Sequence, residues 1–213
     1  MTFFDMKTMY TMRKTLASML RRRGFTVPPN LIVESLVDFS AIYNDVAFTS
    51  TIVASKNNVT LERLVIFFAD VEIKLGIVPI RDHYIPMMQE MDVQHGILVS
   101  KMGLTNPAIH ALRELPDVSG VWIETFTEAE LLFDLMSHEK VPLHRLLTPS
   151  ERQKILKKYR VTDKQLMILQ LEDPVSKYLG LAVGDVIEIT RMTQTANMRI
   201  YRIVEDSESN VKK

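Results

Sequence analysis

The chain has 213 residues, no cysteine, and 26 basic against 26 acidic side chains, so its formal net charge is zero. The lack of cysteine excludes disulfides, thiolate nucleophiles and cysteine-ligated metal sites, and the neutral charge excludes a molecule-wide attraction to polyanions. No apolar run approaches the roughly 20 residues that span a bilayer, and the N-terminus lacks the apolar centre of a signal peptide. We therefore expect a soluble intracellular protein.

The first elements are expected to be two helices and a strand. Apolar side chains recur at helical spacing from Met9 to Leu20, and Gly24 ends that helix. A second helix is expected after Pro28 and Pro29, with a stripe formed by Ile32, Leu36, Phe39 and Tyr43. Residues 46–54 are rich in β-branched side chains, which predicts a strand.

The middle of the chain alternates strand and helix. Residues 64–68 are apolar on both faces, which is typical of a strand inside a sheet that is covered on each side. A helix is expected at 81–91, where Pro86 must bend it or lie in its first turn. A buried strand at 96–99, a short helix opening at Pro107 and a strand at 121–123 follow. This alternation predicts a small α/β domain.

The C-terminal part has a different rhythm. Thr148 to Glu151 form a capping box that starts a helix, Asp173 starts a shorter one, and two strands at 185–189 and 199–204 form an antiparallel pair. The predicted fold class is therefore α+β or α/β in two domains. An N-terminal α/β domain with a mixed sheet covers residues 1–138, a small C-terminal α+β domain covers 139–205, and a disordered tail covers 206–213.

The stretch HEKVPLH contains two histidines and a carboxylate within one short segment. A zincin motif places two histidines four residues apart on one helix, whereas His138 and His144 are six apart and Pro142 interrupts any helix between them. No cysteine is present to complete a ligand set. We therefore expect no metal and no cofactor here, and interpret the segment as a connector.

A glutamate and a lysine stand two residues apart after the strand at 64–68. Many metal-dependent nucleases carry Glu-x-Lys on a strand, with an aspartate from a neighbouring element that helps to bind Mg²⁺. Glu72 and Lys74 have this spacing, and the candidate aspartates are Asp38, Asp45 and Asp70. A solvated turn explains the same pair, so a metal-dependent nuclease is the alternative function rather than the favoured one.

Basic residues cluster in two places. Arg21 to Arg23, with Arg13 and Lys14 upstream, form either a phosphate-facing patch or a solvated helix end. The lysines of ERQKILKKY are interpreted as the outer face of an amphipathic helix. The aromatic residues lie mostly in apolar stripes, so no base-stacking platform is expected, and the neutral charge disfavours a free-standing DNA-binding regulator.

Several segments together resemble one family. HEKVPLH, LTPSERQKILKKYRVTDKQL, DPVSKYLGL, GDVIEITR and IYRIV occur in this order. They resemble the shared fifth-largest subunit of the eukaryotic nuclear RNA polymerases, and the shorter archaeal counterpart of that subunit resembles this C-terminal part alone. The segments RRRGF, HGILVSKMGLTNPA and IETFTEAEL extend the resemblance, more weakly, through the N-terminal part.

The resemblance implies a non-catalytic subunit of a DNA-directed RNA polymerase in the nucleus. Its C-terminal assembly domain would dock on the largest subunit, and its N-terminal jaw domain would lie beside downstream DNA during transcription. The partners implied are the other polymerase subunits and, weakly within the assembled enzyme, the downstream duplex. The family supplies no catalytic residue, no metal ligand and no cofactor, and no membrane contact is implied.

The family pattern also assigns site residues. Those expected to bind the partner subunit are His144, Asp173, Pro174, Val175, Tyr178, Gly180, Arg191, Thr195, Tyr201 and Arg202. Those expected near DNA are Lys101, Thr105, Asn106 and Pro107. The chain departs from the pattern where the family reads Leu-Pro-Arg-Ile, because it has Leu166-Met167-Ile168-Leu169. The chain also has Ala182 and Val183 at two positions where the family has basic residues. These departures suit a divergent copy that serves one polymerase.

Overall fold

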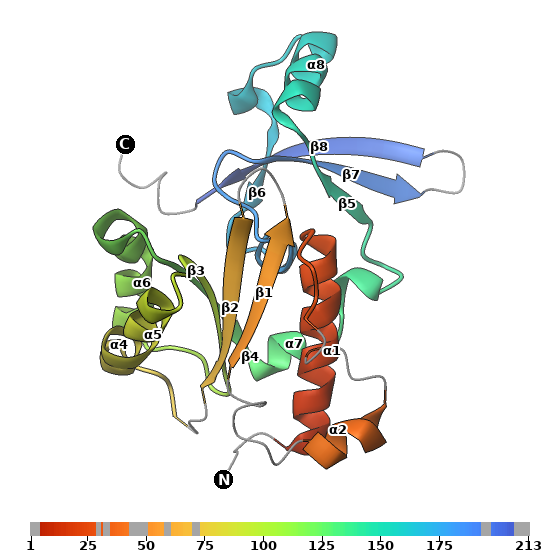
Figure 1. Ribbon diagram of the computed structural model, residues 1–213. Helices are drawn as coiled ribbons and strands as arrows, with labels where there is room; N and C mark the ends of the chain where they lie inside the picture. The colour runs from red at the N-terminus through yellow and green to blue at the C-terminus, as the bar shows by residue number, and fades with distance from the viewer. Residues whose placement is uncertain are drawn as a thin grey trace. The chain divides into compact units, whose positions relative to one another are not determined.

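The chain folds as two compact units, each with its own sheet (Figure 1). This computed structural model describes residues 5–28, 31, 35–42, 51–57, 61–69, 73–192 and 197–206. The units are Met1–Phe133 and Asp134–Lys213, whereas the sequence predicts a domain boundary after residue 138. Both sheets are mixed, which confirms the expected fold class. Among the described residues, no helix is both long and apolar enough to cross a membrane.

The first unit is built around a four-stranded sheet in the order β1-β2-β3-β4. Its elements are α1 (Met6–Arg22), α2 (Leu36–Ile42), β1 (Thr51–Asn57), β2 (Leu61–Ala69), α4 (Ile77–Pro79), the π-helical segment η2 (Ile80–Tyr84), α5 (Ile85–Glu90), β3 (His95–Ser100), α6 (Asn106–Ser119), β4 (Trp122–Thr127) and α7 (Glu128–Leu131). Strand β1 is antiparallel to β2, whereas β2, β3 and β4 are parallel. The part of the predicted strand at residues 46–50 lies outside the described residues.

Helix α1 covers one face of this sheet (Figure 1). The apolar stripe predicted from the sequence is buried along the helix: Met9, Met12, Leu16, Met19 and Leu20. The Arg13 guanidinium lies 5.5 Å from the centre of the Phe68 ring, which places α1 against the side of β2 that carries Phe68. Gly24, with φ of +84°, has the left-handed backbone that glycine adopts at low cost, and the chain leaves the helix there.

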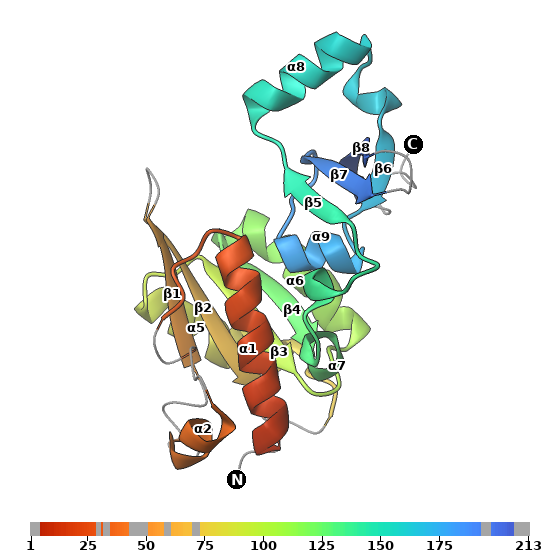
Figure 2. The ribbon, with the colours of Figure 1, turned by 90° about the vertical axis from the view of Figure 1, so that its right-hand side faces the viewer.

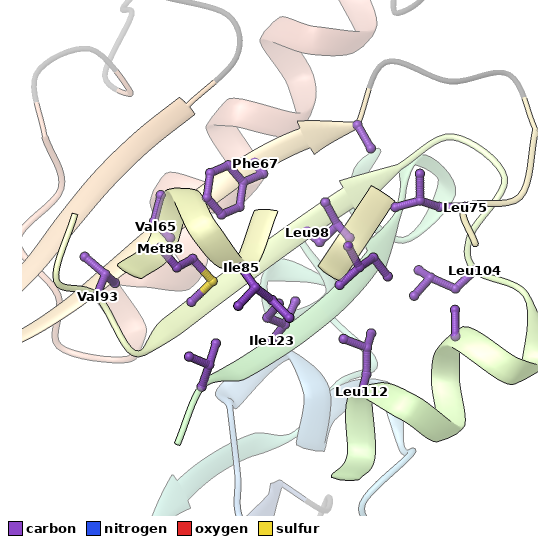
Figure 3. Close-up of a cluster of buried hydrophobic side chains, with 14 residues drawn as sticks. Val65, Phe67, Leu75, Ile85, Met88, Val93, Leu98, Leu104, Leu112 and Ile123 are labelled. Atoms are coloured by element: carbon purple, nitrogen blue, oxygen red, sulfur yellow. The ribbon is translucent and has the colours of Figure 1, made fainter. Parts of the chain in front are cut away.

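Helices α5 and α6 cover the opposite face (Figure 3). Phe67 and Leu98 on the strands pack against Ile85, Met88 and Leu112 on the helices. Burial of each such side chain stabilises the fold by about 1.5–3 kcal/mol. The sheet is therefore apolar on both sides, as the run at 64–68 predicts.

The helix expected at 81–91 begins earlier and contains an irregular turn. It runs from α4 through η2 to α5, over residues 77–90. Pro86 has no N–H to donate to the preceding turn. The chain accommodates it with a wider turn, in which the Ile85 N–H bonds to the Ile80 carbonyl. The prediction was thus right about the helix and wrong about its start.

The second unit has a smaller sheet in the order β5-β7-β8-β6. Its elements are the 3₁₀ turn η3 (Leu135–Ser137), β5 (Leu143–Leu146), α8 (Pro149–Tyr159), the 3₁₀ turn η4 (Asp163–Gln165), β6 (Met167–Gln170), α9 (Pro174–Leu179), β7 (Val186–Met192) and β8 (Asn197–Glu205). Both helices and the β7–β8 pair confirm the sequence prediction. The strands β5 and β6 were not predicted, because four residues are too few to show an alternating pattern. The expected tail lies, from residue 207 on, outside the described residues.

The two helices of this unit lie on opposite sides of its sheet (Figure 2). On one side, which we call the α8 face, Ile155 of α8 packs against Val186 and Ile203. On the other, the α9 face, Leu179 packs against a cluster that includes Ile187 and Val204. Successive side chains of a strand point to opposite faces, so the register assigns every strand residue of this unit to one face or the other.

Candidate partner-binding and DNA-proximal surfaces

Helix α9 is fixed at both ends by its own sequence. The Asp173 carboxylate accepts a hydrogen bond of 2.8 Å from the Val175 N–H, and Pro174 occupies the first turn, where its missing N–H costs nothing. Gly180, at φ of +64°, ends the helix. The Ser176 hydroxyl donates to the Gln170 carbonyl at 2.9 Å and ties α9 to the end of β6. The predicted residues of this segment therefore shape the helix and hold it in position.

Tyr178 is buried and is bonded to a residue that the sequence analysis missed. Its hydroxyl donates to the Asp134 carboxylate at 2.6 Å, and the same carboxylate accepts from the Met136 N–H at 3.1 Å. Because one acid holds both η3 and α9, Tyr178 joins the start of this unit to its centre. No motif in the sequence marks Asp134, because its partner lies 44 positions away.

His144 is a half-buried side chain on β5. Its Nδ1–H donates to the Pro142 carbonyl at 2.7 Å, which leaves Nε2 as the hydrogen-bond acceptor of a neutral ring. Burial lowers the pKa of His144, and the nearby Arg191 and Arg202 lower it further, whereas the Pro142 bond and Asp173 raise it. The net direction is downward, so the imidazole is neutral at physiological pH.

These electrostatic effects reveal a cluster on the α9 face. Asp173, Arg191 and Arg202, predicted from three other segments, each lie near enough to His144 to affect its pKa. We call these four residues the α9-face cluster. Arg191 is exposed near the end of β7, and Arg202 donates to the Ile168 carbonyl at 3.0 Å.

Exposed apolar side chains surround the α9-face cluster. Leu146, Ile187, Arg202 and Met167 form one row of neighbours across the four strands. Ile187 in the middle is buried, whereas Leu146 and Met167 at the two ends are exposed, as is Met198 opposite Arg191. Guanidinium groups beside apolar side chains are typical of protein–protein interfaces.

Of the predicted partner-binding residues in the β7–β8 hairpin, Tyr201 and Thr195 are not part of this cluster. Tyr201 points to the α8 face, where its hydroxyl donates to Glu188 at 3.1 Å. Burial and the Glu188 carboxylate raise the pKa of Tyr201. The pleat of a strand already puts Tyr201 and its neighbour Arg202 on opposite faces, but only the pairing of β8 with β7 and β6 shows which of the two joins the α9 face. Thr195 lies outside the described residues.

The four predicted DNA-proximal residues lie together after β3. The Leu75 N–H donates to the Gly103 carbonyl and the Thr105 N–H donates to the Leu75 carbonyl, each at 3.0 Å, so the loop is braced against the segment after β2. Gly103 has φ of +75°, which favours glycine at this turn. Asn106 and Pro107 are exposed in the first turn of α6. Helix α6 extends to Ser119 and is longer than expected.

The nuclease alternative gains no support from the described residues. Glu72 lies outside them, and Lys74 is exposed. Within the described ranges, no three histidine or acidic side chains are grouped so that they could hold a metal ion. In HEKVPLH, the His138 Nδ1 accepts from the Lys140 N–H at 3.2 Å, so both histidines of this stretch bond to the backbone.

The basic run at the end of α1 is divided by the fold. Arg21 and Arg22 are exposed, but Arg23 turns inward and donates two hydrogen bonds, of 2.8 and 2.7 Å, to Glu124. Although burial raises the pKa of this carboxyl, Arg23 and His95 together lower it to about 2. His95 in turn stacks on Trp122, with ring centres 5.1 Å apart. Arg23 therefore supports the fold rather than a phosphate-facing patch.

Comparison with known proteins identifies similar chains. Residues 5–87 match the family model "RNA polymerase Rpb5, N-terminal domain", and residues 133–204 match "RNA polymerase Rpb5, C-terminal domain". The chain is 31% identical to subunit RPABC1 of DNA-directed RNA polymerases I, II, and III from Caenorhabditis elegans over 204 residues, which cover 92% of this chain and 95% of the relative. Identity to the Dictyostelium discoideum subunit of the same name is 30%, with 93% and 98% covered. Identity to DNA-directed RNA polymerase subunit 5-like protein 1 of Arabidopsis thaliana is 31%, with 90% and 92% covered.

Proposed function

Because the chain belongs to the Rpb5 family of RNA polymerase subunits, we propose that it is a non-catalytic subunit of a nuclear RNA polymerase that docks on the largest subunit through its second unit. The observation that carries the docking proposal is the α9-face cluster with its exposed apolar border. A sheet face that is only partly covered by its own helix is well suited to packing against another chain. Departures such as Met167, which is exposed at the end of this face, suit a divergent family member.

The charges of the cluster indicate the chemistry of the docking partner. Arg191 and Arg202 present guanidinium groups, which bind carboxylates through paired hydrogen bonds. The neutral His144 contributes an acceptor at Nε2 and no repulsive charge. A partner surface that combines acidic and apolar side chains fits this arrangement.

The docking test is a charge reversal with a matched control on the same hairpin. Arg191 and Arg199 are both exposed arginines, but Arg191 lies on the α9 face and Arg199 on the α8 face. After affinity purification of the tagged chain from cells, Arg191→Glu should retain about tenfold less of the largest subunit, as expected for like charges brought together at an interface. Arg199→Glu should retain it at the wild-type level. Equal retention by both variants would place docking elsewhere.

The same purification identifies the polymerase, and a fluorescent fusion tests the compartment. Mass spectrometry of the co-purified chains shows which large subunits are present. A single polymerase would support a specialised copy, and several would support a shared subunit. We further propose that the protein is nuclear, and a fluorescent fusion that stays outside the nucleus would contradict this.

We also propose that the first unit is a jaw beside downstream DNA. The braced loop presents Asn106 and Pro107 at its surface, with Lys101 at its start. With a formal net charge of zero, the contact must be local and weak, because few cations release few counterions. The assembled enzyme would hold the loop near the duplex and raise its effective concentration there.

Crosslinking in the assembled polymerase tests this second proposal. Lys101→Glu, or Thr105→Asp combined with Asn106→Asp, should weaken the crosslink from this subunit to downstream DNA without releasing the subunit. Lys7→Glu, an exposed lysine on α1, provides the control. A crosslink that maps to the second unit, or one that is unchanged in both loop variants, would show that a different surface faces the DNA.

A further inference from the structure

Helix α8 and the turn that follows it carry an excess of positive charge. Residues 149–166 contain the acidic side chains Glu151 and Asp163 and six basic ones: Arg152, Lys154, Lys157, Lys158, Arg160 and Lys164. Ile155 packs the helix onto the α8 face. The positive charge is therefore concentrated on a helix that lies on the opposite side of the sheet from the α9-face cluster (Figure 2).

Both acidic side chains of this segment already form ion pairs with arginines, Glu151 with Arg145 and Asp163 with Arg152. Glu151 accepts from Arg145 at 2.7 Å and from the Thr148 N–H at 2.9 Å, as part of the helix cap. Asp163 accepts from Arg152 at 2.9 Å. The local acids therefore stabilise the fold of the segment and leave the remaining cations uncompensated.

Five cations remain, and we call them the α8 basic surface. They are Lys154, Lys157, Lys158, Arg160 and Lys164, and all five are exposed. Within the described part of the chain, none of the five forms an ion pair. Residues three and four apart on a helix lie on neighbouring positions of its surface, so the lysines at 154, 157 and 158 form one continuous patch.

An exposed aromatic ring borders the patch. Tyr159 is 51% exposed, and the Lys158 ammonium lies 5.3 Å from the centre of its ring. The ring lies near that of Tyr201, with centres 5.8 Å apart and the planes tilted by 48°. The sequence predicts that the aromatic residues lie mostly in apolar stripes and offer no platform for stacking, but Tyr159 presents an exposed ring beside the cations.

Helix stability does not account for this arrangement. Cations in the last turn interact favourably with the helix dipole, which explains Lys157 and Lys158 only. Arg160 occupies a left-handed position with φ of 55° and ψ of 41°, where glycine is favoured and other residues are strained. The chain thus carries a cation at a position where the fold favours glycine.

We propose that the α8 basic surface binds the phosphate backbone of single-stranded nucleic acid, with Tyr159 stacking on a base. Lysines at neighbouring helix positions that form no ion pair are suited to contact successive phosphates of a nucleic-acid strand. An exposed aromatic ring beside them is suited to stack on an unpaired base. A base in a duplex is stacked within its own helix and is not available to the ring. An acidic peptide would use the cations but not the ring. This surface goes beyond the proposed docking and jaw contacts, and it stands on the opposite face from the docking cluster.

Fluorescence anisotropy with the isolated full chain and a labelled RNA of about 20 nucleotides tests the proposal. At ~50 mM salt we expect dissociation constants in the range of about 1–100 μM, as for non-specific binding. Combining Lys154→Gln, Lys157→Gln and Lys158→Gln should weaken binding at least tenfold. For single strands each lost phosphate contact removes about 0.7 from the slope of log K against log salt, so the slope should fall by about 2.

The control removes the same charge elsewhere. Combining Lys7→Gln, Lys14→Gln and Lys140→Gln, all exposed lysines outside α8, should leave both affinity and slope unchanged. Tyr159→Leu should weaken RNA binding about tenfold, should leave duplex binding unchanged, and should be rescued by Tyr159→Phe. Circular dichroism confirms that each variant is folded.

Three outcomes would overturn the proposal. They are an equal loss in the control triple variant, tighter binding to a poly-glutamate peptide of matched charge than to RNA, and no RNA binding at low salt. Because the assay uses the isolated chain, its failure leaves the docking proposal intact, and failed docking leaves this proposal intact.

Discussion

The two units use their sheets differently. In the first unit, β3 is buried along its centre, with Ile97, Leu98 and Val99 fully enclosed between helices. In the second, β7 is buried at its start, but it ends in Arg191 and Met192, the latter 86% exposed. The first unit therefore covers its own sheet, whereas the second leaves part of a sheet face open. A sheet that its own helices cover on both faces is suited to a rigid unit, and a sheet with a partly uncovered face is suited to packing against another chain.

The difference extends to how each core is held. The first unit has a core of fourteen buried side chains on one face alone, whereas the second has clusters of five and three. A small core stabilises a fold less. We expect the second unit to depend more on individual polar anchors and on its partner. Several measurements test this contrast, and the single tryptophan, Trp122, reports on the first unit by fluorescence.

The largest effect is expected from the buried ion pair of the first unit. Glu124→Ala leaves Arg23 enclosed without its carboxylate, which should destabilise the unit by about 3–5 kcal/mol. The change in the free energy of unfolding is measured by denaturant titration, with Trp122 fluorescence as the signal. As a control, Asp82→Ala breaks the exposed Arg81–Asp82 pair and should leave the transition unchanged. A small effect of Glu124→Ala would show that the first unit does not rely on this pair.

Acid should have a matching effect on the first unit. The pKa of Glu124 is about 2 in the folded chain against 4.5 ordinarily, so its stabilising contribution is complete above pH 4.5. It is lost as the pH falls from 4.5 towards 2. Glu124→Gln should remove this part of the acid sensitivity from the fluorescence transition.

Matched core truncations compare the two units directly. Leu98→Ala in the first unit should cost about 2–5 kcal/mol, as enclosed leucines do. Leu169→Ala in the small cluster of the second unit should cost about 2 kcal/mol, because a short edge strand relaxes around the lost volume. The first should shift the tryptophan transition, and the second should shift only the circular dichroism transition. If Leu169→Ala also shifts the tryptophan transition, the units do not unfold separately.

The polar anchor of the second unit is tested by removing one oxygen. Tyr178→Phe deletes the 2.6 Å bond to Asp134 and should destabilise the unit by about 1.5–3 kcal/mol, as the loss of a bond to a charged group does. Calorimetry of the full chain measures it. Tyr159→Phe removes an exposed hydroxyl from the same unit and serves as the control. Equal effects of the two changes would mean that the bond to Asp134 is not an anchor.

The smallest effect is a pH dependence confined to the second unit. The folded pKa of His144 lies below the usual 6.5, because burial disfavours the charged ring. The unfolded chain therefore binds the proton more readily, and stability falls as the pH drops below 6.5. His144→Gln should flatten this part of the profile by circular dichroism. A tryptophan transition that follows the same profile would assign the titration to the first unit instead.

Sequence alone determined the elements with strong periodicity or clear caps. The α1 stripe from Met9 to Leu20, the capping box at Thr148 and the β7–β8 pair all lie where the pattern predicts them. The sequence also indicated the family, because several segments of the second unit resemble the family's and occur in the same order. The signals for the elements are local, because each depends on residues close together in the chain, whereas the family signal depends on the order of several segments. Local chemistry therefore fixed most of the elements and the family.

Only the tertiary structure decided which residues meet. Arg23 was indistinguishable from Arg21 and Arg22 until Glu124, 101 positions away, was brought beside it. Tyr201 and Arg202 are adjacent in a strand and so face opposite sides of the sheet, but only the pairing of β8 with its neighbours shows that Tyr201 meets Glu188 and that Arg202 lies beside Ile187 and Met167. The gathering of His144, Asp173, Arg191 and Arg202 likewise depends on β5, which is too short to be recognised and is held in place by pairing with β7. Strand pairing joins distant segments through backbone hydrogen bonds, which leave no pattern in the side chains of either segment alone.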